Sequence, residues 1–160
     1  ALYLDADTQA PRTATAADLA AIAATTEDDG MMPLVDAVLS GEGAKLTGEL
    51  ARFRQQGLSP VGTVLAMERR VAQLAKLAAR IKGKGDIASF VKAEVQAGRV
   101  FFKEQGAITL QLQCWRGPRL ARLGERLIEL HRALIFDSQS APLIFAAGCT
   151  SIARAAQGRH

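Results

Sequence analysis

The chain has 160 residues, of which 49% are hydrophobic, 22% charged and 5% aromatic, an ordinary composition for one globular domain and part of a second. It contains no apolar run of the roughly 20 residues that a membrane span needs, no recognisable signal peptide and only two cysteines, so we expect a cytoplasmic protein with reduced thiols and no membrane contact. The net charge of +4 is divided unevenly, because residues 1–30 carry −5 and residues 31–160 carry +9.

The first 30 residues predict the remnant of a small helical domain. Apolar residues 2–4 fit the last turn of an upstream helix, and since the sequence starts there without Met, we expect a fragment of a longer protein. A polar loop follows, and then a short helix that begins at Thr15, whose hydroxyl can cap it, with Asp18 three residues later. The polar run 26–30 ends this helix.

Three helices are predicted next, separated by turns that contain glycine. The first starts near Pro33 and ends at residues 40–41, and the second covers residues 44–56 with a glycine after it. The third is long: it begins at Pro60, with a serine as its cap, and ends within residues 82–85. Its predicted apolar side consists of Val61, Val64, Leu65, Val71, Leu74, Ala78 and Ile81.

Two shorter helices are predicted between residues 86 and 115. The first ends at Gly98. In the second, the alternation of Ile108, Leu110 and Leu112 alone favours a strand. A single strand would have no partner in an otherwise helical chain, so we expect a helix there as well.

Two long helices complete the chain. One begins at Pro118, and its leucines repeat at spacings of three and four, which predicts a seam for packing in a bundle. The last begins at Ala141 and is expected to turn Phe145 and Gly148 inward. We therefore expect an all-α fold, a helical bundle. The leucine seam consists of Leu120, Leu123, Leu127, Leu130 and Leu134.

The reactive side chains form no recognisable catalytic or metal-binding pattern. His131 and His160 lack a second histidine at ligand spacing, and Cys114 and Cys149 do not form a CxxC pair. The glycine-rich residues 41–48 fail as a phosphate-binding loop, because their lysine is followed by leucine and a predicted helix, rather than a strand, precedes them. We expect no enzymatic activity, no cofactor and no metal site.

Basic residues are concentrated between Arg69 and Lys103, where nine bases and two acids give a net charge of +7. A second group, Arg119, Arg122 and Arg126, is expected on the helix face opposite the leucine seam. Both groups fit a solvated surface, and both also fit attraction to nucleic-acid phosphates or to an acidic partner.

Phe101 and Phe102 stand between Arg99 and Lys103. Aromatic rings beside basic residues can stack on the bases of a single strand. Packing in the core is the alternative, and we expect one of the two rings to be in the core. The candidate DNA-facing residues are Arg80, Lys82, Lys84, Arg99, Phe101, Phe102 and Lys103.

Several segments resemble, in their order and spacing, those of one known family. Over nearly its whole length the chain resembles the C-terminal part of the delta subunit of bacterial DNA polymerase III, which belongs to the sliding-clamp loader. Residues 83–99 match poorly, and Leu134–Asp137 is more apolar than the segment usual there. The segments that carry the resemblance are Thr15–Ile22, Leu34–Gly41, Leu50–Gly57, Ser59–Val61, Val64–Arg70, Val100–Lys103, Trp115 with Pro118–Leu120, and the Ala-rich last helix.

The resemblance implies an architecture and a set of partners. Residues 1–30 would be the C-terminal tail of an AAA+-type lid domain, and residues 31–160 a helical collar domain that packs against the collar domains of the tau or gamma and delta-prime subunits. The region that binds the sliding clamp would lie upstream, and primed template DNA would lie near the basic surface. The alternative is a stand-alone basic helical module that binds nucleic acid.

Overall fold

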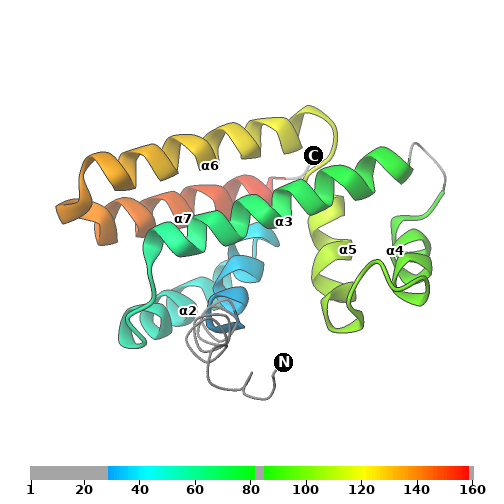
Figure 1. Cartoon of the computed structure of the whole chain (residues 1–160), viewed down its shortest axis with the longest axis horizontal. Coiled ribbons are helices and arrows are strands. Elements are labelled where there is room, and N and C mark those ends of the chain that lie inside the picture. Colours follow the sequence, from blue (N-terminus) through cyan, green and yellow to red (C-terminus); the bar gives the residue numbers. More distant parts are fainter. Residues whose placement is uncertain (1–28, 82–84, 159–160) are drawn as a thin grey trace, which may run out of the picture. The chain divides into compact units, whose positions relative to one another are not determined.

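The computed structural model describes residues 29–81 and 85–158 (Figure 1). The chain divides into two units, Ala1–Gly30 and Met31–His160, and the description below covers the second unit and the two described residues before it. The lid-domain tail and the Thr15 helix expected at the start of the chain lie outside the described residues, as do Lys82, Lys84 and His160.

The all-α prediction is confirmed, and the described residues contain no strand. Residues 29–39 are helical, and two short 3-10 turns, η1 (Phe102–Glu104) and η2 (Ser138–Ser140), precede the helices that follow them. The α-helices are α2 (Gly43–Gln55), α3 (Pro60–Ile81), α4 (Ile87–Gln96), α5 (Gln105–Cys114), α6 (Pro118–Phe136) and α7 (Ala141–Gln157).

The long helices α3, α6 and α7 run alongside one another and form the main body of the bundle (Figure 1). Helix α6 is antiparallel to both neighbours, α2 packs on α7, and the α4–α5 pair packs on α3 through α5. Because α4 and α5 lie at the C-terminal end of α3, the segment that joins them is carried at one end of the bundle.

The leucine seam of α6 is confirmed, since all five side chains are buried. Gly148 on α7 faces this seam, as expected: a Cβ built there would lie 2.8 Å from both Cδ atoms of Leu130. The missing side chain therefore lets α6 and α7 approach closely.

The predicted start of α3 and the predicted end of α4 are also confirmed. Ser59 Oγ accepts a hydrogen bond of 3.0 Å from the Gly62 amide at the start of α3, next to Pro60. Gly98 follows α4 with a φ of +80°, a left-handed conformation that suits glycine. Asp86, which the sequence analysis did not single out, caps α4 through the Ser89 amide at 3.1 Å.

One predicted helix start and one predicted helix face are wrong. The helix expected to start near Pro33 already includes Asp29 and Gly30, because Met31 adds a buried side chain one turn before Leu34. Residues 26–28 of the turn expected before it lie outside the described residues. On α3, Leu65 is exposed, whereas Met67 and Leu77 are in the core. The buried side chains of α3 repeat at the usual spacing of three and four, but one of these positions is Arg70. Because an arginine is not expected in a core, the buried face could not be recognised from the apolar residues alone. The buried side chains of α3 are Thr63, Val64, Ala66, Met67, Arg70, Leu74 and Leu77.

Candidate functional site

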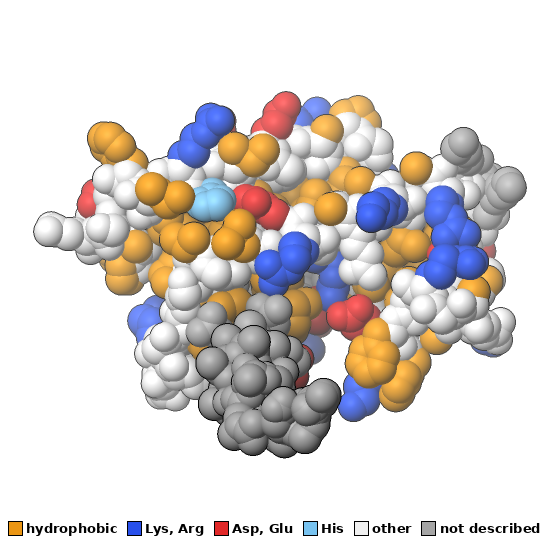
Figure 2. Space-filling model, viewed as in Figure 1, with side chains coloured by type: hydrophobic (Ala, Val, Ile, Leu, Met, Phe, Trp, Pro, Cys, Tyr) orange, Lys and Arg blue, Asp and Glu red, His pale blue; other side chains and the backbone are white. Residues whose placement is uncertain are grey.

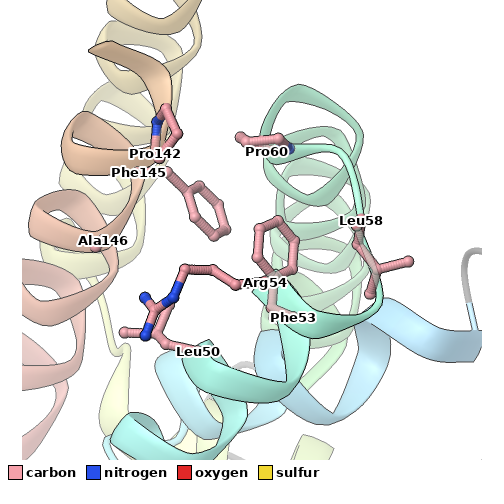
Figure 3. A pocket seen from close by; sticks show the side chains of 9 residues that line it. Leu50, Phe53, Arg54, Leu58, Pro60, Pro142, Phe145 and Ala146 are labelled. Carbon is pink, nitrogen blue, oxygen red and sulfur yellow. The ribbon is translucent and has the colours of Figure 1, made fainter.

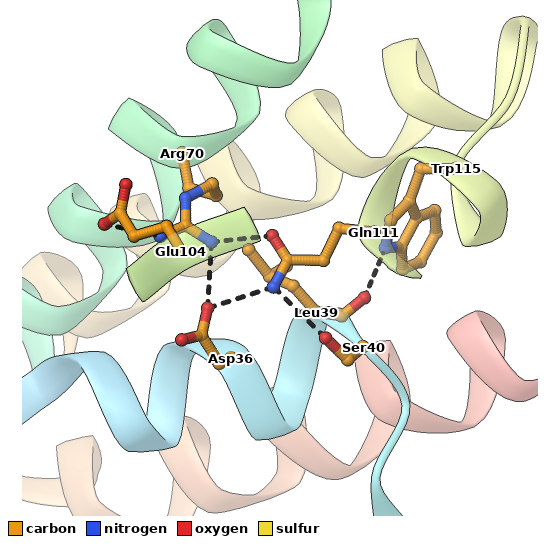
Figure 4. Close-up of polar contacts among 7 residues, drawn as sticks. All are labelled: Asp36, Leu39, Ser40, Arg70, Glu104, Gln111 and Trp115. Carbon is orange, nitrogen blue, oxygen red and sulfur yellow. Dashed lines mark hydrogen bonds and ion pairs between the residues drawn. The ribbon is translucent and has the colours of Figure 1, made fainter. Parts of the chain in front are cut away.

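A buried polar network lies where α3, α5 and the helix of residues 29–39 meet (Figure 4). At its centre is Arg70 on α3, with a side chain that is only 2% exposed. Its Nη1 donates to Asp36 Oδ1 at 2.8 Å and to Gln111 Oε1 at 2.9 Å, and its Nη2 donates to Glu104 Oε2 at 3.2 Å. Two carboxylates therefore compensate one buried guanidinium.

The same network continues along α5. Gln111 Nε2 donates to Asp36 Oδ1 at 3.0 Å and to Ser40 Oγ at 3.1 Å. The indole N–H of Trp115 donates to the Leu39 carbonyl at 2.8 Å. These three bonds join α5 and its C-cap to residues 36–40, and the bonds of Arg70 add α3, so the network fixes the position of α5 against both segments. The sequence analysis did not predict this network. The one signal in the sequence was Arg70, a charged residue at a position where the helical spacing of α3 places a buried side chain.

A buried acid, Glu94 on α4, holds two of the candidate DNA-facing arginines. Arg99 donates from Nε to Oε1 at 2.9 Å and from Nη2 to Oε2 at 3.0 Å, and Arg80 Nη1 lies 2.7 Å from Oε1. The hydrogen bonds from Arg99 lower the pKa of Glu94 below its usual 4.5 against burial, which raises it, and the charge of Arg80 adds to the lowering. We call Glu94, Arg80 and Arg99 the Glu94 cluster. Its arginine side chains remain about half exposed (46% and 51%), so their outer faces still meet solvent.

The backbone after α4 is fixed on the same residue. The amides of Arg99 and Val100 both donate to the Glu94 carbonyl, at 2.9 and 3.3 Å. Val100 is buried, whereas Phe101 and Phe102 are 56% and 63% exposed. The expectation that one of the two rings is in the core is therefore wrong. Val100 fills that place, and the chain turns outward before α5 begins.

The two rings lie against each other on the surface. Their centroids are 5.0 Å apart and their planes meet at 67°, an edge-to-face arrangement. Lys103 Nζ lies 5.9 Å from the centroid of the Phe102 ring. Figure 2 shows hydrophobic side chains projecting at the α4–α5 end, with Lys and Arg side chains on either side. Among the described candidates the structure thus brings together Arg80, Arg99, Phe101, Phe102 and Lys103.

Of the three α6 arginines expected on a solvated face, Arg122 is exposed, whereas Arg119 and Arg126 contact α7. Arg119 donates to the Ala155 carbonyl at 2.6 Å and to the Gly158 carbonyl at 3.2 Å, at the C-terminal end of α7. Arg126 donates to the Ser151 hydroxyl, also on α7. The prediction is wrong for these two residues because α7 packs along that flank of α6. Arg119 also stabilises the carbonyl end of α7, where a cation is favourable.

The cysteines and the described histidine do not form a reactive site. Cys149 is fully buried, and burial raises the pKa of its thiol to about 12, so the thiolate needed for nucleophilic attack is absent at neutral pH. His131 Nδ1 lies 3.4 Å from Glu68 Oε2 and links α6 to α3. Within residues 29–81 and 85–158, no three His, Cys, Asp or Glu side chains gather as a metal site would require.

A small cavity of about 260 Å³ opens between the N-terminal ends of α3 and α7 and the end of α2 (Figure 3). Phe53 and Phe145 stack at its wall with ring centroids 4.7 Å apart. Arg54 is the only charged residue that lines it. With one charged group and an apolar wall, the cavity offers no pair of groups for acid–base chemistry.

Large apolar side chains are exposed on α3, α6 and α7. Leu65 on α3 and Ile128 and Ile135 on α6, here called the α3–α6 patch, are all more than a third exposed. Figure 2 shows hydrophobic side chains gathered over the N-terminal half of α3 and the C-terminal half of α6. Leu143 on α7 is 77% exposed and borders a shallow groove of small residues. No described helix is both long and apolar enough to cross a bilayer.

No family model matches the chain, and no curated protein or solved structure matches it.

Proposed function

We propose that residues 31–160 are a non-catalytic assembly domain, the collar domain of a delta subunit in the cytoplasmic clamp loader of bacterial DNA polymerase III. Residues 1–30 would be the tail of the preceding lid domain. The resemblance of the sequence segments brings this family forward, and the helical bundle is compatible with it. The observation that carries the proposal is the exposure of large apolar side chains on both flanks of α6.

The two apolar surfaces lie on different sides of the bundle. Ile128 follows Arg126 by two residues, which places the two side chains about 160° apart around α6. Arg126 bonds α7, so the α3–α6 patch lies on the opposite flank from the groove that Leu143 borders. In the pair α3 and α6, the Glu68–His131 contact sets the register. One turn away from it along the two antiparallel helices, Leu65 and Ile135 come to the same level.

Two distinct apolar surfaces are what a subunit in a ring requires. A subunit inside a closed ring contacts one neighbour on each side through different faces. The neighbours we propose are the collar domains of the tau or gamma and delta-prime subunits. Sliding-clamp contact would belong to the region upstream, and primed template DNA would pass near the basic α4–α5 end.

Size-exclusion chromatography of the chain with folded tau or gamma and delta-prime subunits tests the proposal. We expect co-elution at micromolar concentration, its loss in I128E/I135E, and its loss or weakening in Leu143→Glu. Gln96→Glu on α4 adds a carboxylate to a different exposed position and is the matched control. Absence of co-elution of the parent chain with folded partners contradicts the proposal.

A stand-alone nucleic-acid-binding module is the second candidate, and the exposure of both Phe101 and Phe102 favours it. It predicts DNA binding without a protein partner and with a steep salt dependence. Replacing Arg80, Lys82 and Lys84 by Ala is expected to flatten that dependence, and an unchanged slope removes those three residues from the interface.

A further inference from the structure

We propose that Phe101 and Phe102 form a stacking site for the unpaired bases of a single strand, with Lys103 beside a backbone phosphate. The proposal deepens the second candidate function, on which it rests, and it does not depend on the assembly proposal. It also divides the roles of the candidate residues, because Arg99 and Arg80 hold Glu94 and leave one positive charge beside the rings.

The segment that carries the two rings is anchored on both sides. Before it, Glu94 holds Arg99 by two side-chain hydrogen bonds and holds the amides of Arg99 and Val100 by its carbonyl. After it, Glu104 pairs with the buried Arg70 at 3.2 Å. Val100 between these anchors is buried. The backbone of the rings is therefore fixed before any ligand arrives, which removes much of the ordering cost of binding.

The exposure of two neighbouring aromatic rings requires an explanation. Phe side chains contribute strongly to stability when buried, and rings left more than half exposed beside each other are typical of binding surfaces. Since the two planes meet at 67°, the rings direct their open faces differently. That geometry fits successive bases that are splayed apart, as in a single strand, rather than the parallel stack of a duplex.

The charge around the rings favours a nucleic acid over an apolar groove of a protein. Glu94 neutralises one of its two arginines, so the Glu94 cluster retains one positive charge. Lys103 adds a second positive charge at 5.9 Å from the Phe102 ring. An apolar groove that covered the rings would leave these charges desolvated without a partner. A phosphate backbone neutralises them while its bases cover the rings.

Fluorescence anisotropy with a labelled oligothymidine of about 12 nucleotides tests the site on the full chain. We expect F101L/F102L to raise Kd about 10- to 100-fold, because leucine keeps the apolar bulk but lacks a flat face for stacking. F101Y/F102Y keeps the ring and is expected to bind within about twofold of the parent. Lys103→Ala is expected to reduce the slope of log K against log salt by about 0.7, whereas the leucine variant leaves the slope unchanged.

The controls separate the possible failures. Lys76→Ala, which removes an exposed lysine on α3, is the control for loss of charge alone. The ratio of its affinities for the single strand and for a duplex of equal length is expected to equal that of the parent. If F101L/F102L and the parent unfold at the same temperature, the exposed rings do not contribute to stability, and a loss of binding is not caused by unfolding. If the parent binds the oligomer and the leucine variant binds equally well, the stacking site is wrong and the second candidate survives. If the parent does not bind it, both are wrong. If F101L/F102L loses only its co-elution with the clamp-loader subunits, the rings contact a protein and the stacking proposal is rejected.

Discussion

Replacing Arg70 by methionine tests the buried polar network most directly. The substitution keeps an unbranched side chain of similar length in the seam of α3 but removes the charge that two carboxylates share. Removing one partner of a buried ion pair costs about 3–5 kcal/mol. Asp36 and Glu104 are 29% and 33% exposed and can regain water, so we expect the lower end, about 3 kcal/mol, or a fall in Tm of about 10 °C. Arg70→Lys is expected to reduce the free energy of unfolding by about half as much, since one ammonium group cannot make the separate contacts of the two guanidinium nitrogens.

Urea unfolding followed by tryptophan fluorescence measures this effect. Trp115 is the only tryptophan, it is buried, and its indole N–H belongs to the same network. We expect a lower midpoint with an unchanged m value, because the substitution does not alter the surface exposed on unfolding. Arg122→Met, on the exposed side of α6, is the matched control and is expected to change stability by less than about 0.5 kcal/mol. If Arg70→Met is as stable as this control, the network does not hold α5 in the way the distances indicate.

Three further predictions concern acid stability, helix packing and thiol reactivity. The pKa of Glu94 is lowered in the folded state, so its stabilising effect is present above pH 4.5 and is lost as the pH falls through the lowered pKa. Glu94→Gln is therefore expected to reduce stability most near pH 7 and to match the parent in acid, which urea midpoints across pH measure. Gly148→Ala is expected to destabilise the fold by about 1–2 kcal/mol, because the new Cβ would meet the Leu130 side chain. Gly124→Ala is expected to stabilise the fold by up to about 1 kcal/mol, because its Cβ would meet only one atom, at 4.0 Å, and alanine favours a helix. Thermal unfolding of the two variants tests both expectations. Cys149 is expected to resist a thiol reagent at pH 8 in the folded chain and to react after unfolding in urea, and rapid reaction without urea would contradict its burial.

Local signals predicted most of the helix boundaries. Ser59 and Pro60 mark the start of α3 because a hydroxyl cap and a proline act within one turn of the chain. The leucine spacing in α6 predicted its buried side for the same reason. The α5 segment shows the limit of such patterns. Its alternating apolar residues favoured a strand, and only the requirement for a partner strand led to the correct helix.

The candidate interface was predicted in part. Arg80, Arg99, Phe101, Phe102 and Lys103 do gather at one end of the bundle, and short sequence separation explains most of that. What the sequence did not reveal is that Arg80 and Arg99 share a buried acid, because Glu94 lies 14 residues from Arg80. Nor did it reveal that both rings point outward, since the burial of Val100 depends on where α4 packs.

The sequence by itself determined the all-α class, most of the helix starts and ends and the seam of α6, because each depends on residues within a few turns of one another. Tertiary structure alone decided the roles of individual polar side chains. Arg70, Arg80, Arg99 and Arg119 are all basic in the sequence, yet one is buried between carboxylates, two hold Glu94 and one stabilises the end of α7. A long charged side chain stabilises the fold only where an opposite charge or a carbonyl stands within about 3 Å, and that proximity arises from packing between helices distant in the chain.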